Sequence, residues 1–250
     1  VLGNSMLIPV FPKFEQVLHI SQVKVGLLVT AFSLPAGLLI PFSGMLSDRV
    51  GRKIVIAPAL VLYGLGGLVA GIASVTMAKP FMIIIVGRVL QGLGAGGTYQ
   101  LAMALTADLT GEGKLTRHLG FLEASNGFGK VVSPILGALV AMITWWAPFF
   151  VYGVLAFPVA ALVWFGLDEP NPGGQGKSWQ EYFKTLGQIF KKKGVSLLAT
   201  YLVGFIALGV LFGFLSYLSD VLEQRFHLQG VGKGLAMAVP VSAMAITSYS

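Results

Sequence analysis

The chain has 250 residues, of which 55% are hydrophobic and only 11% are charged, and its mean hydropathy is +0.81. Soluble domains carry about 25% charged residues, so the composition excludes an ordinary soluble protein. The net charge of +7 is expected from basic loops of a membrane protein, not from a nucleic-acid surface. The absence of cysteine excludes disulfides and thiolate metal sites, and the three scattered His show no metal-ligand spacing.

Apolar stretches follow one another along the chain, and six of them are long enough to cross a bilayer. They cover residues 21–45, 54–75, 81–107, 118–144, 147–167 and 196–221. Two more crossings are incomplete, at residues 1–12 and 231–250. The sequence therefore predicts an all-α polytopic membrane protein. We expect it to be a fragment of a longer chain, from the end of a first helix to part of an eighth.

Basic residues and a polar interval predict the orientation and the domains. Ten Lys and Arg lie in one set of alternate loops and five in the other, so the first set should face the cytoplasm. Residues 168–193 would be a cytoplasmic linker between a six-helix half, 1–167, and the start of a second half, 194–250. Within the linker, apolar residues at helical spacing from Trp179 to Phe190 favour an amphipathic helix on the membrane surface. A solvated linker helix is the alternative.

The loop after the first complete crossing reads G-M-L-S-D-R-V-G-R-K over residues 44–53. Glycines bracket a turn, an acid ends a helix and bases fill the loop. A basic cytoplasmic loop with turn glycines would explain the charge. It would not explain the spacing of Asp48 and Gly51.

The crossing at 81–107 carries G-R-V-L-Q-G-L-G-A-G over residues 87–96. At 100° per residue, Arg88, Gly92, Ala95 and Tyr99 share one face. An intramembrane arginine usually faces a cavity or a partner and marks a substrate or ion path. The alternative is an arginine that snorkels to the membrane surface.

The next crossing carries G-K-V-V-S-P-I-L-G-A over residues 129–138. Glu123 and Lys130 share its helical face with small residues, and Asn126 adjoins them. This face is not expected to point at lipid. Lys130 has two open readings, a part in substrate or coupling chemistry and a structural salt bridge.

These three motifs resemble motifs A, B and C of the major facilitator superfamily, in the correct order and at the correct crossings. Motif C indicates the drug:proton antiporter branch of bacterial multidrug efflux transporters, which has twelve helices. Ser133 and Ala138 replace two of its glycines, and both replacements are small enough for close helix packing. The resemblance implies two six-helix halves that rock around a midplane cavity.

The resemblance also implies roles for individual residues. The motif A gate would comprise Gly44, Asp48, Arg49, Gly51, Arg52, Lys53 and nearby Asp108. Proton coupling would rest on Arg88, which would lower the pKa of a nearby acid, and on Glu123 or an acid beyond this chain. Helix packing at motif C would involve Gly129, Ser133, Pro134 and Gly137. Candidate cavity residues are Asn4, Gln91, Tyr99, Asn126, Lys130, Phe212 and Tyr217, with Phe32 and Phe205.

The predicted function is secondary active efflux of amphipathic drugs or endogenous metabolites such as a siderophore. The partners would be a small-molecule substrate, protons and the lipid bilayer. We expect a monomer in the plasma membrane, with no cofactor and the proton gradient as energy source. Alternatives are a uniporter or symporter for another solute, or a non-transporting scaffold if the gene ends near Ser250. An enzyme is not expected, because the spans hold no His cluster, no paired acids and no G-x-S-x-G elbow.

Overall fold

The computed structural model describes residues 2–110, 114–169, 179–228 and 230–247. Every regular element in these ranges is a helix, which confirms the predicted all-α fold. In chain order the elements are α1 Leu2–Ser5, the 3-10 helix η1 Ile8–Val10, α2 Phe11–Leu18, α3 Gln22–Val50, α4 Arg52–Thr76, α5 Phe81–Gly96, α6 Tyr99–Leu109, α7 Leu115–Ile143, α8 Ala147–Gly166, α9 Trp179–Gln224 and α10 Gly230–Thr247.

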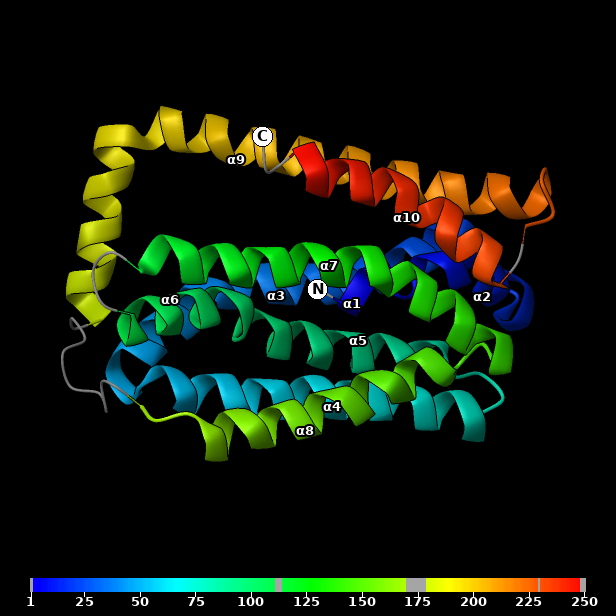
Figure 1. The fold of residues 1–250 in the computed structure, drawn as a ribbon, viewed down its shortest axis with the longest axis horizontal. Coiled ribbons are helices and arrows are strands. Elements are labelled where there is room, and N and C mark those ends of the chain that lie inside the picture. The colour runs from blue at the N-terminus through cyan, green and yellow to red at the C-terminus, as the bar shows by residue number, and fades with distance from the viewer. Residues whose placement is uncertain (1, 111–113, 170–178, 229, 248–250) are drawn as a thin grey trace.

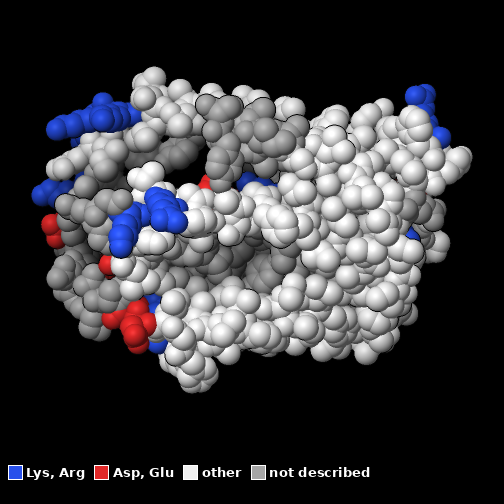
Figure 2. Space-filling view, in the orientation of Figure 1, with Lys and Arg blue, Asp and Glu red and all other residues white. Residues whose placement is uncertain are grey.

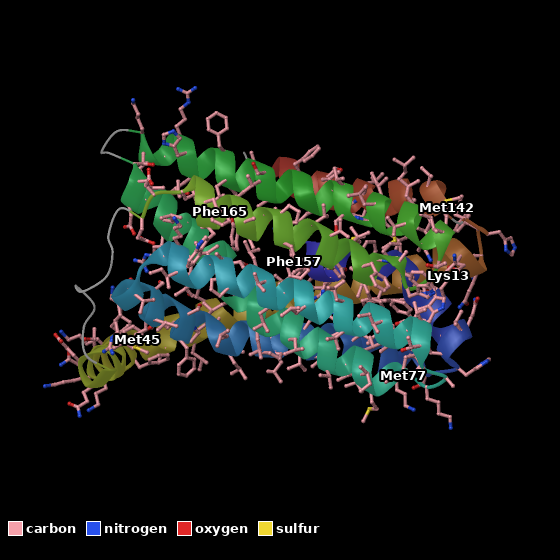
Figure 3. The ribbon with its side chains drawn as sticks, turned by 90° about the horizontal axis from the view of Figure 1, so that it is seen from below. Lys13, Met45, Met77, Met142, Phe157 and Phe165 are labelled. Carbon is pink, nitrogen blue, oxygen red and sulfur yellow. The ribbon has the colours of Figure 1, made fainter. Side chains whose placement is uncertain are left out.

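The long helices lie lengthwise in one bundle (Figure 1). Six segments of the described chain are long and apolar enough to cross a membrane: α3, α4, α5 with α6, α7, α8 and most of α9. Figure 3 labels Met45 near one end of the bundle and Lys13, Met77 and Met142 near the other. We call these the Asp48 end and the Lys13 end. On the face shown in Figure 2, charged side chains gather mainly at the Asp48 end and leave a broad uncharged middle.

Glycine allows α4 and α5 to pack closely. A Cβ atom on Gly66 would lie 2.5 Å from the carbonyl oxygen of Gly87, and one on Gly87 would lie 2.6 Å from that of Gly66. Small residues at facing positions are the usual way for membrane helices to approach each other, because van der Waals packing drives their association. The glycines of motif B thus fix the position of the helix that carries Arg88.

Two of the predicted crossings are not single helices in the structure. The crossing at 81–107 is divided at Gly97 and Thr98 into α5 and α6, so residues before and after this turn do not share one helical face. The stretch 1–12 is not one helix end but α1, η1 and the start of α2. Pro9 and Pro12 explain this break, because proline lacks the N–H that a continuous helix would need.

The helix α9 contains both the predicted linker helix and the seventh crossing. Its backbone bends at Lys193, where φ is −129° and ψ is 17°, and Figure 1 shows the part before the bend turned across the Asp48 end. The predicted helix at the linker is therefore confirmed. Residues 170–178 and the side chains of Trp179, Phe183 and Leu186 lie outside the described part, so the surface location stays a prediction.

Candidate functional site

The junction of α3 and α4 forms a charged cluster at the Asp48 end. Gly51 makes the turn with φ at +104°. Residues that have a Cβ atom rarely adopt this backbone conformation. The turn directs Arg52 toward two acids: its Nη1 lies 2.5 Å from Asp48 Oδ1 and its Nε 3.2 Å from Asp108 Oδ2. Arg52 Nη1 also donates to Ser47 Oγ at 2.6 Å. The predicted gate residues Asp48, Arg52 and Asp108 thus meet, and α6 is joined to α3 and α4.

The same cluster reaches the end of α8, which the sequence did not reveal. Lys53 Nζ donates to the carbonyl oxygen of Leu167 at 2.6 Å, and its backbone N–H donates to Glu169 Oε2 at 2.7 Å. A Cβ atom on Gly51 would lie 2.9 Å from Glu169 Cδ, so the glycine also makes room for this carboxylate. The other oxygen, Oε1, is buried without a hydrogen bond. By contrast, a Cβ atom on Gly44 would meet open space.

Arg88 lies in the centre of the bundle and is 0% exposed. Its Nε donates to the carbonyl oxygen of Leu28 at 3.1 Å, and its Nη1 donates to that of Gly3 at 2.9 Å and to Gln91 Oε1 at 2.9 Å. Nη2 donates to Asn4 Oδ1. The guanidinium therefore connects α5 to α1 and α3.

The environment of Arg88 is aromatic and neutral. Its guanidinium carbon lies 4.5 Å from the ring centroid of Phe32, a cation–π distance. The Tyr152 hydroxyl donates to the same Gly3 oxygen at 3.1 Å. Full burial rules out the snorkelling alternative. The acid expected beside Arg88 is absent from its hydrogen bonds and ion pairs within the described part, where every partner is a carbonyl, an amide or a ring.

Glu123 belongs to a separate group between α6 and α7. The Tyr99 hydroxyl donates to Glu123 Oε2, and Asn126 Nδ2 donates to Oε1 at 3.0 Å. The helical face predicted for Arg88 and Tyr99 is interrupted at Gly97 and Thr98, between α5 and α6. Lys130 is half-buried and forms no ion pair with Glu123 in the described structure. A structural salt bridge between Lys130 and Glu123 is therefore not formed, and a part of Lys130 in substrate or coupling chemistry stays a prediction.

The motif C face of α7 contacts the N-terminal segment and α10. A Cβ atom on Gly137 would overlap the carbonyl oxygen of Met6, so the glycine admits the N-terminal segment. On α10, a Cβ atom on Gly234 would lie 2.9 Å from Ile135 Cα and 3.2 Å from the carbonyl oxygen of Pro134. Ser133 is buried, and its hydroxyl has no hydrogen-bond partner among the described residues. The predicted packing role of this face is thus seen at Gly137 and Pro134, whereas Gly129 is only half-buried.

At the Lys13 end, α9 is bonded to the first part of the chain. The buried Ser219 hydroxyl donates to the carbonyl oxygen of Ile8 at 3.1 Å, and Gln22 Nε2 donates to Asp220 Oδ2 at 2.6 Å. Next to these contacts, Lys233 of α10 is 2% exposed and its Nζ lies 2.7 Å from Glu223 Oε2. Sequence periodicity gave no sign of these pairs.

Glu15, on α2 outside the six spans, faces the same acids. Burial, followed by the negative charges of Asp220 and Glu223, raises the pKa of Glu15 above its usual value. A cavity of about 300 Å³ lies here between α2, α3 and α9, and its lining includes Phe212 and Tyr217. At the Lys13 end, the carboxylates of Glu15 and Asp220 therefore line the same cavity as the rings of Phe212 and Tyr217.

The predicted cavity residues make their contacts at separate places in the described part of the structure. Asn4 and Gln91 are buried against Arg88, Tyr99 and Asn126 bind Glu123, and Phe212 and Tyr217 lie at the Lys13 end. Phe205 is 76% exposed. A helical face predicted from spacing gives a direction around the helix but not the depth of each residue along the bundle, which is why these positions separated.

Comparison with known proteins identifies the family. Residues 1–250 match the family described as Major Facilitator Superfamily. The chain belongs to the major facilitator superfamily. A bacillibactin exporter of Bacillus subtilis (strain 168) is 40% identical over 250 residues, which are 99% of this chain and 62% of that relative. The quinolone resistance protein NorA of Staphylococcus aureus (strain MW2) is 28% identical over 159 residues, 62% of this chain and 40% of NorA.

The resemblance inferred from the three motifs is thus confirmed, and the two relatives are named as an exporter and as a drug resistance protein, as the drug:proton antiporter branch implies. The family is one of membrane transporters and not of enzymes, and the six span candidates agree with a multi-pass membrane protein. It spans 62% of the length of the bacillibactin exporter.

Proposed function

We propose that this chain supplies most of one half, the linker and the start of the second half of a proton-coupled exporter of amphipathic organic compounds. The transporter would act as a monomer in the plasma membrane, with the Asp48 end and the linker in the cytoplasm. No cofactor would be needed, because the proton gradient supplies the energy. The 40% identity to a bacillibactin exporter makes bacillibactin the first substrate to test, and the likeness to NorA makes a quinolone the second.

One observation carries the proposal of alternating access. Two hydrogen bonds join α9 to the first part of the chain at the Lys13 end, from the Ser219 hydroxyl to the carbonyl oxygen of Ile8 and from Gln22 Nε2 to Asp220 Oδ2. At the Asp48 end, Arg52 binds acids of its own half. The contacts of α9 at the Lys13 end are expected of a transporter that is closed on its outer side, and alternating access would break them.

We further propose Glu123 as a proton carrier. Its partners, the Tyr99 hydroxyl and the Asn126 amide, are neutral, so protonation of the carboxylate would break no ion pair. Asp48 and Asp108 are poorer candidates, because protonation of either would break an ion pair with Arg52. Arg88 would instead fix the N-terminal helices against α5, since the partners that it contacts carry no charge.

The test uses proteoliposomes of the full-length protein loaded with bacillibactin or a quinolone, with and without an imposed proton gradient. Glu123→Gln should abolish uphill transport but retain substrate exchange, and Tyr99→Phe should weaken coupling. Asp168→Asn, the same chemical change at an exposed acid at the end of α8, should transport normally. Uphill transport by Glu123→Gln would reject the carrier role. Equal flux without a gradient would favour a uniporter, and no flux of any solute would favour the scaffold.

A further inference from the structure

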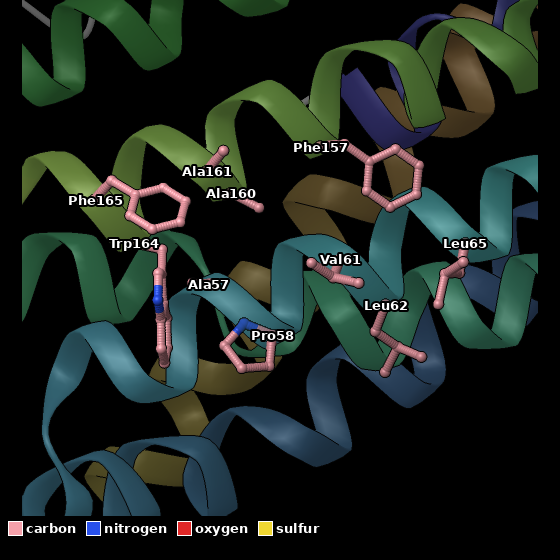
Figure 4. A pocket seen from close by; sticks show the side chains of 10 residues that line it. All are labelled: Ala57, Pro58, Val61, Leu62, Leu65, Phe157, Ala160, Ala161, Trp164 and Phe165. Atoms are coloured by element: carbon pink, nitrogen blue, oxygen red, sulfur yellow. The ribbon is translucent and has the colours of Figure 1, made fainter.

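An apolar groove runs along the surface between α4 and α8 (Figure 4). Its volume is about 560 Å³, within the range of small-molecule binding sites. The small residues Ala57, Pro58, Ala160 and Ala161 leave the space, and Phe157 and Trp164 are among the larger residues that border it. We call it the α4–α8 groove.

The position of the groove decides what kind of molecule can occupy it. Both α4 and α8 are membrane-spanning candidates, and Trp164 and Phe165 on the groove are 45% and 85% exposed. A surface at this depth of a bilayer is covered by lipid, so its occupant must be apolar. Phe157 and Phe165 lie eight residues apart on α8, which places them about 12 Å apart along the helix. The groove is therefore elongated along the membrane normal, as an acyl chain is.

A cation stands at the Asp48 end of the groove. Lys53 Nζ lies 5.9 Å from the ring centroid of Trp164 and donates to the carbonyl oxygen of Leu167. An ammonium has three N–H donors, so further donors remain for a phosphate. Lysine and tryptophan together are typical of the level at which lipid headgroups lie. Glu169 contacts the backbone N–H of Lys53 and Asp168 is exposed beside it, so the site suits a phosphate held at one point and not a polyanion.

We propose that the α4–α8 groove binds one phospholipid, with an acyl chain between Ala57 and Ala161 and the phosphate at the Lys53 ammonium. The source is the membrane leaflet at the Asp48 end. This inference rests on the membrane location of the family and not on the substrate or on proton coupling.

The experiment labels the full-length protein in vesicles with a phospholipid that carries a photoreactive diazirine in its acyl chain. Labelled peptides are then identified by mass spectrometry. Labelling of α4 and α8 should saturate and be competed by unlabelled phospholipid. A diacylglycerol probe with the same chain tests the contribution of the phosphate.

Two matched variants test the site. Ala161→Trp fills the groove from an exposed position, and Leu162→Trp adds the same ring on the next residue, which is 69% exposed and outside the groove. Loss of about two buried methylene groups corresponds to about tenfold weaker binding, so Ala161→Trp should lower labelling by about that factor. Leu162→Trp should not. Val61→Trp, on the α4 wall, gives a second obstruction if Ala161→Trp is poorly folded.

Lys53→Gln should lower labelling by the phospholipid probe and leave the diacylglycerol probe unchanged. Equal labelling of the Ala161→Trp and Leu162→Trp proteins, or labelling that does not saturate, would overturn the proposal and show only general contact with bilayer lipid. An equal loss of both probes in Lys53→Gln would reject the phosphate contact.

Discussion

Gly66→Ala is expected to destabilise the bundle and to impair transport together. The new Cβ atom would lie 2.5 Å from the carbonyl oxygen of Gly87 and 2.6 Å from the backbone nitrogen of Gln91. Both are backbone atoms, so no side chain can rotate away. Ordinary contact begins at 3.4 Å, and α4 and α5 must therefore separate by about 0.9 Å.

The magnitude depends on two opposed effects. Overpacking of this kind lowers the free energy of unfolding by about 1–3 kcal/mol. Replacing glycine by alanine in a helix raises it by about 1 kcal/mol. The matched control is Gly37→Ala on α3, where a Cβ atom meets nothing within 4 Å and only the helix gain applies. The two variants should differ by about 1–3 kcal/mol, which corresponds to about 2–12 °C in Tm for a chain of this size.

The effect on function comes through Arg88, one residue after Gly87. Its bonds to Leu28 and Gly3 are 3.1 and 2.9 Å long, so a shift of about 0.9 Å is enough to break them. The assay is the temperature at which half of the purified protein stays monodisperse on size exclusion, together with flux in proteoliposomes. Equal Tm values for Gly66→Ala and Gly37→Ala would refute the close-packing argument. A normal flux in a destabilised Gly66→Ala would refute the link to Arg88.

Three further predictions concern the two ends of the bundle. Asp48→Asn removes one partner of Arg52 but leaves its other contacts. The free energy of unfolding should therefore fall by less than about 1 kcal/mol in thermal unfolding, while flux is severely reduced. Wild-type flux would show that motif A is only a topological signal. The chain has no cysteine, so a thiol cross-linker applied to Gln22→Cys with Asp220→Cys should stop transport until reduced, whereas the single variants keep working. Because the pKa of Glu15 is raised, its ionised form opposes folding, and stability should increase as pH falls through that pKa; Glu15→Gln should remove this pH dependence in thermal unfolding.

The sequence predicted the parts of this fold that depend on local pattern. The spans, the turn at Gly51 and the grouping of Asp48 with Arg52 follow from hydrophobic runs and from a motif only ten residues long. The sequence did not predict the contact of Glu169 with Lys53, which are more than one hundred residues apart in the chain. A pair so far apart leaves no trace in hydrophobic periodicity. Spacing alone also extended one helical face through Gly97, where the backbone turn rotates α6 relative to α5.

The neutral surroundings of Arg88 were equally invisible in the sequence. A spacing argument can show that an arginine lies within a span, but it cannot show which acceptors other helices bring to it. Here two of them are main-chain oxygens of Gly3 and Leu28. An acid was expected from the family resemblance, and main-chain acceptors leave no mark in the sequence that could have corrected this expectation.

The broken helices at the start of the chain offer their neighbours main-chain oxygens. Gly3 accepts from Arg88 and from Tyr152, and Ile8 accepts from Ser219. Such acceptors do not depend on the side chain of the residue that carries them, so alanine scanning would not report these bonds. Replacing single amides by esters, which weakens the carbonyl acceptor, is the chemical change that would reveal how strongly this segment is held.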